Sequence, residues 1–267
     1  MVLDAAMGTR LIALGLDQVR DDPCLWNLEH PERVLAIHAR DRAAGAEALT
    51  TNTFGASRPV LERFGRSGDL ERINQAAVAL ARSAGGPGAF VLGNLGPRVA
   101  EEPGAAAHQA RVLAQAGVDA LVMETFTALP AVRVLDELTD ADPSWPPLLV
   151  SLWQWPEAAG ALAGRLMDHG AAAVGMNCQA GAAAALAFAR SIADIASIPL
   201  YLRPSAVAGQ ADSDPEAFAR AVPAWVAAGG RMLGGCCGTT ERHVATIRQA
   251  LDLLVPLVDP REVSPIP

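Results

Sequence analysis

The stretch Ala116-Gly117-Val118-Asp119, followed by the apolar run Ala120–Met123, marks the end of one helix and the start of a β-strand. A glycine just past a helix adopts the left-handed backbone conformation that closes the last turn. The same pattern recurs as Ala44-Gly45-Ala46-Glu47 and as His169-Gly170-Ala171-Ala172. The recurrence predicts that a helix is followed directly by a strand at several points along the chain.

Short apolar runs alternate with longer segments of helical period along the whole chain. Successive strand starts lie 25 to 46 residues apart, which leaves room for a crossover helix between parallel strands. Strands are expected at Val2–Asp4, Ala48–Thr51, Phe90–Gly93, Ala120–Met123, Leu148–Leu152, Ala173–Met176, Leu200–Leu202 and Met232–Leu233. Helices are expected at Pro31–Ala44, Asp69–Ser83, Ala105–Ala116, Ala128–Leu138, Ala158–His169, Ala182–Ile195, Asp214–Ala228 and Glu241–Leu254.

Eight strands alternating with eight helices predict an α/β fold, a single closed (β/α)8 TIM barrel. We expect one domain over residues 1–267, with a loose tail after about residue 255. A doubly wound open sheet is the alternative. The segment Asp4-Ala5-Ala6-Met7-Gly8-Thr9, which follows the first strand, has neither a GxGxxG pattern nor the lysine of a P-loop. The absence of both patterns after the first strand argues against nucleotide binding.

Composition excludes several classes of protein. The 267 residues carry a net charge of −8, and no basic block stands out, so we expect no nucleic-acid surface. Hydrophobic residues make up 51% of the chain, which is enough for a large core. No apolar run approaches the length of a membrane helix, and Asp4 interrupts any signal-peptide core. These observations predict a cytoplasmic protein that does not bind a membrane.

Three of the four cysteines lie at predicted strand ends. Cys178 follows the sixth strand, and Cys236 and Cys237 follow the eighth. Because active sites of such barrels lie at the carboxyl ends of the strands, we expect the three thiols to converge there. Three thiolates suit Zn²⁺, and three protein ligands leave the fourth position open, as in catalytic sites. The alternative is that Cys178 is an inert buried residue and the pair is accidental.

Motifs in the same regions extend this interpretation and occur in a fixed order. They are Asp4-Ala5-Ala6-Met7-Gly8-Thr9, Thr51-Asn52-Thr53-Phe54-Gly55, Glu124-Thr125, Gly175-Met176-Asn177-Cys178 and Gly234-Gly235-Cys236-Cys237-Gly238-Thr239-Thr240. Together they resemble the homocysteine S-methyltransferase family, in particular the homocysteine-binding barrel of cobalamin-dependent methionine synthases. The resemblance runs from residue 3 to about residue 250.

The chain departs from the family pattern at three places. Ala5 replaces a glycine in the opening motif, and Arg203-Pro204-Ser205-Ala206 replaces a P-N-x-G turn after the seventh strand. Ser151-Leu152-Trp153-Gln154-Trp155 replaces an S-F element after the fifth strand. The three cysteines are intact. The departures therefore concern the substrate and donor contacts rather than the metal ligands.

The resemblance implies transfer of a methyl group to the thiol of homocysteine, which forms methionine. It implies Zn²⁺ on Cys178, Cys236 and Cys237, with the substrate sulfur as the fourth ligand and nucleophile. It implies that Asp4 and Glu124 hold the substrate's ammonium group and that the backbone around Ala5 holds its carboxylate. Asn52 and Thr53 are expected to line the substrate pocket. The residues alone also allow structural roles. Asp4 can cap the end of its strand, and Glu124 can pair with a nearby arginine. Asn52 and Thr53 can be ordinary turn residues after the second strand.

The methyl donor is left open at this stage. S-methylmethionine, S-adenosylmethionine, a betaine and a methyl-corrinoid are the options. A corrinoid or folate protein in trans is a possible partner. Trp153 and Trp155 offer aromatic faces to a cationic donor, although exposed loop tryptophans are the simpler interpretation. Two other functions remain as alternatives. They are methylation of a different thiol or selenol, and a non-catalytic thiol-zinc protein.

Overall fold

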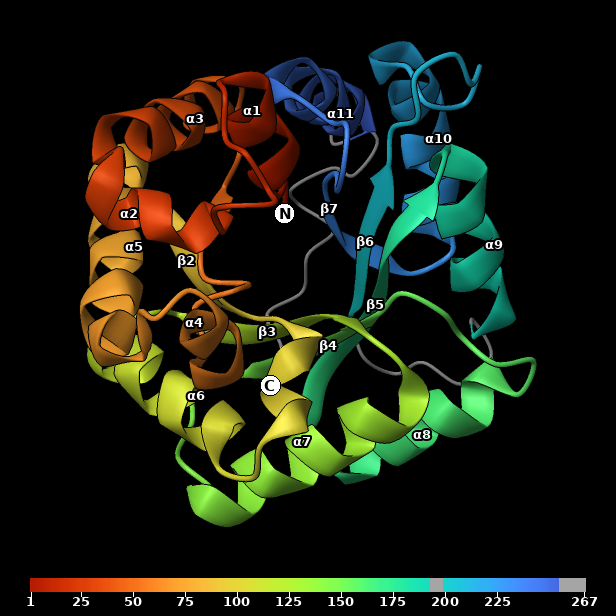
Figure 1. The fold of residues 1–267 in the computed structure, drawn as a ribbon. Coiled ribbons are helices and arrows are strands. Elements are labelled where there is room, and N and C mark those ends of the chain that lie inside the picture. Colours follow the sequence, from red (N-terminus) through yellow and green to blue (C-terminus); the bar gives the residue numbers. More distant parts are fainter. Residues whose placement is uncertain (193–198, 255–267) are drawn as a thin grey trace.

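The computed structural model describes residues 1–192 and 199–254. Within these residues, seven parallel strands form one sheet in which each strand pairs with the next along the chain. The strands are β1 (Ala48–Thr50), β2 (Phe90–Leu95), β3 (Ala120–Phe126), β4 (Leu148–Leu152), β5 (Ala171–Ala180), β6 (Leu200–Ser205) and β7 (Gly230–Leu233). The sheet curls on itself, and the helices lie around its outside (Figure 1).

The segment Val2–Asp4 lies between the two edges of this sheet. Val2 forms a parallel bridge with Leu233 of β7, and Leu3 forms one with Ala48 of β1. The backbone N–H of Leu3 donates to the carbonyl oxygen of Leu233 at 2.8 Å. The segment therefore joins β7 to β1 and closes the barrel, which confirms the predicted TIM-barrel fold.

The first strand, predicted at Val2–Asp4, ends there because side chains take the next backbone donors. The N–H of Ala5 donates to a carboxylate oxygen of Asp41 at 3.2 Å. The N–H of Ala6 donates to the hydroxyl of Thr239 at 3.1 Å. Ladder pairing therefore stops at Asp4, and the chain turns out of the barrel at its carboxyl end.

The long helices occupy the predicted crossover positions. They are α3 (Pro31–Ala43), α5 (Leu70–Gly85), α6 (Ala105–Gln115), α7 (Ala128–Ala141), α8 (Ala159–Asp168), α9 (Ala182–Ser191), α10 (Pro215–Ala227) and α11 (Glu241–Leu254). The predicted helix Ala182–Ile195 ends at Ser191 in α9, and its last residues, 193–195, lie outside the described residues. The predicted tail after residue 255 lies outside them as well.

Short helices that the sequence pattern did not predict lie in the loops between strands and long helices. They are α1 (Gly8–Ala13), η1 (Pro23–Leu25), α2 (Trp26–Glu29), α4 (Arg58–Arg63), η2 (Ser67–Asp69) and η3 (Pro97–Glu101). Three of them begin with a proline in the first helical turn, where its missing N–H is tolerated. All follow the carboxyl ends of strands, so they help to shape the barrel mouth.

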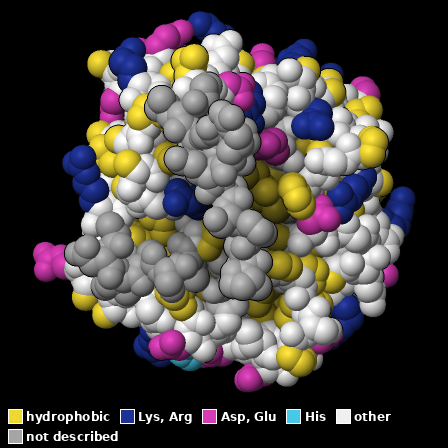
Figure 2. Space-filling model, turned by 180° about the vertical axis from the view of Figure 1, so that it is seen from behind, with side chains coloured by type: hydrophobic (Ala, Val, Ile, Leu, Met, Phe, Trp, Pro, Cys, Tyr) yellow, Lys and Arg dark blue, Asp and Glu magenta, His cyan; other side chains and the backbone are white. Residues whose placement is uncertain are grey.

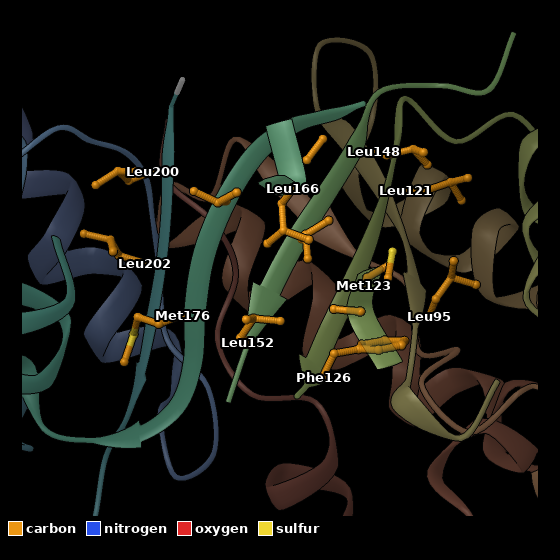
Figure 3. Packing of buried hydrophobic residues seen from close by; sticks show 14 of the residues in the cluster. Leu95, Leu121, Met123, Phe126, Leu148, Leu152, Leu166, Met176, Leu200 and Leu202 are labelled. Atoms are coloured by element: carbon orange, nitrogen blue, oxygen red, sulfur yellow. The ribbon is translucent and has the colours of Figure 1, made fainter. Parts of the chain in front are cut away.

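Two apolar layers result from the alternation of side chains along the strands. One fills the barrel interior and includes Leu92, Val122, Leu149 and Tyr201. The other packs the outer face of the sheet against the helices, from Leu95 of β2 through Phe126 of β3 to Leu202 of β6 (Figure 3). Each fully buried leucine or phenylalanine contributes about 1.5–3 kcal/mol by leaving water. The strand ends above this core are thereby held in fixed relative positions.

The surface carries both signs of charge. On the face opposite to that in Figure 1, arginines and acidic side chains are interspersed with exposed hydrophobic ones (Figure 2). Among the described residues, no helix combines the length and apolarity needed to cross a bilayer.

Candidate metal and substrate site

A layer of buried polar side chains lies at the carboxyl end of the barrel. Because strand side chains alternate, a residue two positions after an interior one points inward again. Glu124 follows Val122 in this way, and Arg203 follows Tyr201. This polar layer comprises Asp4, Thr50, Asn94, Glu124, Ser151, Asn177 and Arg203, each at most 6% exposed.

The structure brings Cys178, Cys236 and Cys237 together, as predicted from the strand ends. Their sulfur atoms all lie within 4.8 Å of one another. The Sγ of Cys178 lies 2.8 Å from that of Cys236 and 3.7 Å from that of Cys237. All four cysteines are free thiols, and Cys24 is buried in an apolar cluster away from this group.

Glycines allow the loop after β7 to present two consecutive thiols. Gly238 has φ of +76°, and a Cβ there would lie 2.0 Å from the carbonyl oxygen of Ala206. A Cβ on Gly235 would lie 2.4 Å from the hydroxyl of Thr239. That hydroxyl donates to the carbonyl oxygen of Cys236 at 2.6 Å. Larger residues at either glycine would therefore displace the loop that carries the cysteines.

Asn177 uses its whole amide group to fix the neighbourhood of Cys178. Its Oδ1 accepts from the N–H of Thr125 at 2.9 Å and from the hydroxyl of Ser151 at 2.8 Å. Its Nδ2 donates to the hydroxyl of Thr125 at 2.7 Å and to the Sγ of Cys236 at 3.9 Å. Both donors and both acceptor positions are used, so the side chain has one favourable orientation.

The protonated thiols are stabilised in the cluster. The hydrogen bond to Cys178 and burial raise the pKa of Cys236 to about 12. Contact with Cys236 favours ionisation of Cys178, but contact with Cys237 and burial outweigh it and raise the pKa of Cys178 to about 11. A divalent cation would reverse this preference, because a coordinating thiol is deprotonated.

The donor set fits zinc. Thiolate is a soft ligand, and zinc sites with three or four cysteines are common. Tetrahedral zinc with Zn–S bonds of about 2.3 Å places its sulfur ligands about 3.8 Å apart. The distance of 3.7 Å between Cys178 and Cys237 matches this separation. The side chains of Cys178 and Cys236 need to separate by about 1 Å to reach it.

Arg203 is a component of the site to which the sequence analysis assigned no role. Its guanidinium lies 3.0 Å from a carboxylate oxygen of Asp4 and 3.0 Å from one of Glu124. Burial raises the pKa of Asp4, although Arg203 and Thr50 oppose this effect. The sequence signal was a charged residue that directly continues the apolar strand Leu200–Leu202.

The other predicted substrate residues hold the loops of the barrel mouth. Asn52 donates to the carbonyl oxygen of Pro23 at 2.6 Å and to the side chain of Asn27 at 3.0 Å. The hydroxyl of Thr53 donates to the carbonyl oxygen of Asn94 at 2.8 Å. Both residues are buried. The N–H of Ala5 donates to Asp41. The polar groups of all three residues thus have hydrogen-bond partners within the protein.

The two tryptophans after β4 differ in environment. Trp153 is 48% exposed, and its backbone N–H donates to the carbonyl oxygen of Phe126 at 3.0 Å. The indole N–H of Trp155 donates to the carbonyl oxygen of Gly175 at 3.0 Å, and its ring packs 4.8 Å from that of Phe188. Trp153 therefore presents an open aromatic surface, whereas Trp155 anchors its loop.

A cavity of about 340 Å³ lies at the same end of the barrel, in a different sector. Asp22, Phe54, Arg63 and Arg98 contribute to its lining. These residues come from the segments after the first strand, β1 and β2, whereas the thiols come from β5 and the loop after β7. The cavity and the thiol cluster are thus separate features of the mouth.

The fold and site together define a TIM barrel with a three-cysteine cluster above a buried layer of charged residues. The sequence model of the homocysteine S-methyltransferase family matches residues 1–251. The chain belongs to this family.

Individual relatives agree with this assignment. The chain is 28% identical to methionine synthase of Mycobacterium tuberculosis and 27% identical to that of Mycobacterium leprae, over 94% of its own length. It spans 24% of the length of each of these relatives. The metallated homocysteine methyltransferase MmuM from Escherichia coli is 25% identical, with a TM-score of 0.78 over 93% of this chain and 95% of that one. The TIM barrel and the family predicted from the motifs are thus confirmed.

Proposed function

We propose that this chain transfers a methyl group to the thiol of homocysteine, forming methionine, with Zn²⁺ held by Cys178, Cys236 and Cys237. The convergence of the three sulfur atoms within 4.8 Å carries the proposal. Membership of the homocysteine S-methyltransferase family and the likeness to a metallated homocysteine methyltransferase support it.

Each part of the site has a role in this proposal. When bound, zinc supplies the charge that keeps a thiol ionised at neutral pH. Three protein ligands leave one position for the substrate sulfur, and the barrel walls orient it toward the donor. Asp4 and Glu124 lie beneath the thiols, where the amino-acid end of the substrate would rest. Ala5, Asn52 and Thr53 support the substrate pocket indirectly, through the contacts with which they hold the surrounding loops.

The methyl donor approaches from the open mouth. Trp153 presents its aromatic face there, and an aromatic face attracts a sulfonium or quaternary ammonium group. We therefore propose a small cationic donor, such as S-methylmethionine, S-adenosylmethionine or a betaine. The likeness to part of methionine synthase favours one other source, a corrinoid or folate protein that presents its own methylated cofactor in trans.

Methionine formation tests the proposal. Zinc-loaded protein is incubated with homocysteine and each donor in turn, and methionine is quantified. We expect turnover with one donor and its loss in Cys178→Ser, while Cys24→Ala retains it because Cys24 lies in a separate apolar cluster. Equal activity in Cys178→Ser and wild type would contradict the proposal.

A further inference from the structure

Arg203 is buried in the polar layer with all of its N–H groups engaged by the protein. The residue is 4% exposed. Its Nε donates to the carbonyl oxygen of Gly235 at 3.0 Å, and Nη1 donates to Thr50 at 2.9 Å and to Glu124 at 3.0 Å. Its Nη2 lies 3.0 Å from Asp4 Oδ1. The guanidinium therefore joins the two carboxylates that lie beneath the thiols.

The two carboxylates are satisfied by the protein itself. Asp4 accepts from the N–H and the hydroxyl of Thr50 at 2.7 and 2.9 Å, in addition to Arg203. Glu124 accepts from the hydroxyl of Tyr201 at 2.7 Å and from Asn94 at 2.8 Å, in addition to Arg203. Each carboxylate thus has three partners, of about four that it can accept. Neither needs a group from a ligand to be hydrogen-bonded.

We propose that Arg203 is a specificity-determining residue that supplies, from within the chain, the positive charge that the ammonium group of an amino-acid substrate would otherwise bring. This inference rests on the proposed function. Its consequence is a broader substrate class: the site takes alkyl thiols with or without an α-ammonium group. The arginine directly continues the apolar residues of β6, which places its guanidinium in the buried polar layer.

The expected size of the effect follows from the state of the buried groups. A site that leaves polar groups unpaired when a substrate lacks its partner group rejects that substrate by about 10⁴–10⁵-fold. Here Arg203 pairs both carboxylates before any substrate arrives. Loss of the ammonium group should therefore change the affinity by less than about tenfold.

Binding of two thiols to the full chain tests the inference without any methyl donor. The protein is loaded with Co²⁺ in place of zinc, and the thiolate-to-cobalt absorption is followed during titration with homocysteine and with 4-mercaptobutyrate. The latter has the same carbon chain and carboxylate but no amino group. We expect dissociation constants within about tenfold of each other.

The outcomes separate the two proposals. Binding of homocysteine that is more than 100-fold tighter would overturn the inference about Arg203 and leave the proposed function standing. If neither thiol changes the cobalt absorption, the proposed function fails and the inference falls with it.

A variant adds a test that a purely structural role of Arg203 would not pass. Arg203→Met leaves Asp4 and Glu124 without their internal cation, so homocysteine should become preferred over 4-mercaptobutyrate by at least 100-fold. Arg66→Met is the matched control, because Arg66 also joins two carboxylates, Glu29 and Asp69, at the surface. Unchanged selectivity in folded Arg203→Met would overturn the inference. If that variant does not fold, the wild-type ratio decides.

Discussion

Asn177 and Thr125 form two hydrogen bonds with each other across the barrel mouth, at 2.9 and 2.7 Å. Thr125 has φ of 65°, and Cys178, the neighbour of Asn177, has φ of 62°. Among the described residues, these two are the non-glycine positions with positive φ. Such a conformation costs about 1–3 kcal/mol, most for a β-branched residue, and persists only where the surroundings hold it. Asn177 therefore links the strained residue beside Glu124 to the strained Cys178 of the thiol cluster.

Asn177→Ala is expected to weaken zinc binding by about 10–100-fold, the usual effect of losing a group that orients metal ligands. The variant loses the bond to Cys236 and the support of the left-handed Cys178. Competition with a chromophoric chelator measures the affinity. Ser151→Ala is the control, because it removes one of the four bonds of Asn177 and should change the affinity less. Equal affinity in Asn177→Ala and wild type would show that the amide does not position the ligands.

Gly238→Ala is expected to lower the free energy of unfolding by at least about 2 kcal/mol, since it combines backbone strain with a clash. Its Cβ would lie 2.0 Å from the carbonyl oxygen of Ala206. Gly209→Ala is the matched control, with φ of +84° and no atom within 4 Å of the added Cβ. Urea denaturation of both variants compares the costs. A similar loss in the two variants would mean that the close approach at Gly238 is unimportant.

Replacement of the two tryptophans should have opposite consequences. Trp155→Ala is expected to cost at least about 2 kcal/mol of stability, because it removes a packed ring. Trp153→Ala should change stability by less than about 0.5 kcal/mol, as at most exposed sites. If the methyl donor is cationic, Trp153→Ala should raise the KM for that donor several-fold. Thermal unfolding and steady-state kinetics measure the two effects, and an unchanged KM would exclude Trp153 from the donor site.

Stability should fall in acid partly because of His38. Burial lowers the pKa of His38 from 6.5 to about 4, while Asp41 raises it and Arg10 lowers it. Below pH 6.5 the unfolded chain therefore binds a proton that the folded chain does not. The free energy of unfolding should decrease by about 3 kcal/mol as the pH falls from 6.5 to 4. Above pH 6.5 His38 is neutral in both the folded and the unfolded chain, so it causes no loss of stability there.

His38→Leu isolates this effect. The difference in the free energy of unfolding between wild type and this variant should depend on pH between 6.5 and 4. Denaturant titrations at a series of pH values provide the measurement. If the free energy of unfolding varied with pH in the same way for wild type and His38→Leu, His38 would not be the neutral buried histidine described here.

Local patterns predicted the barrel because each strand and helix carries its own signal. The recurring phrase at Gly45, Gly117 and Gly170 located three strand starts, and each of these glycines has positive φ. Cys178, Cys236 and Cys237 could be placed together because strand ends of a barrel share one rim. Their occupation by zinc stays a prediction.

The contacts of Arg203 could not be predicted, because they depend on groups from four segments far apart in the sequence. The sequence analysis expected Asp4 and Glu124 to face a ligand, whereas both also face this arginine. Asn52 showed a similar limit, since its partners Pro23 and Asn27 lie in short helices without a periodic signal. Motifs identify which residue types a site contains. Which of these residues form hydrogen bonds or ion pairs with one another depends on the fold.

Zinc K-edge X-ray absorption of the purified, zinc-supplied chain tests the central claim most directly. The account predicts about one zinc per chain with three protein sulfur ligands, rising to four when homocysteine is added, and loss of the metal in Cys178→Ser. A zinc environment without sulfur, or full zinc content in Cys178→Ser, would contradict it.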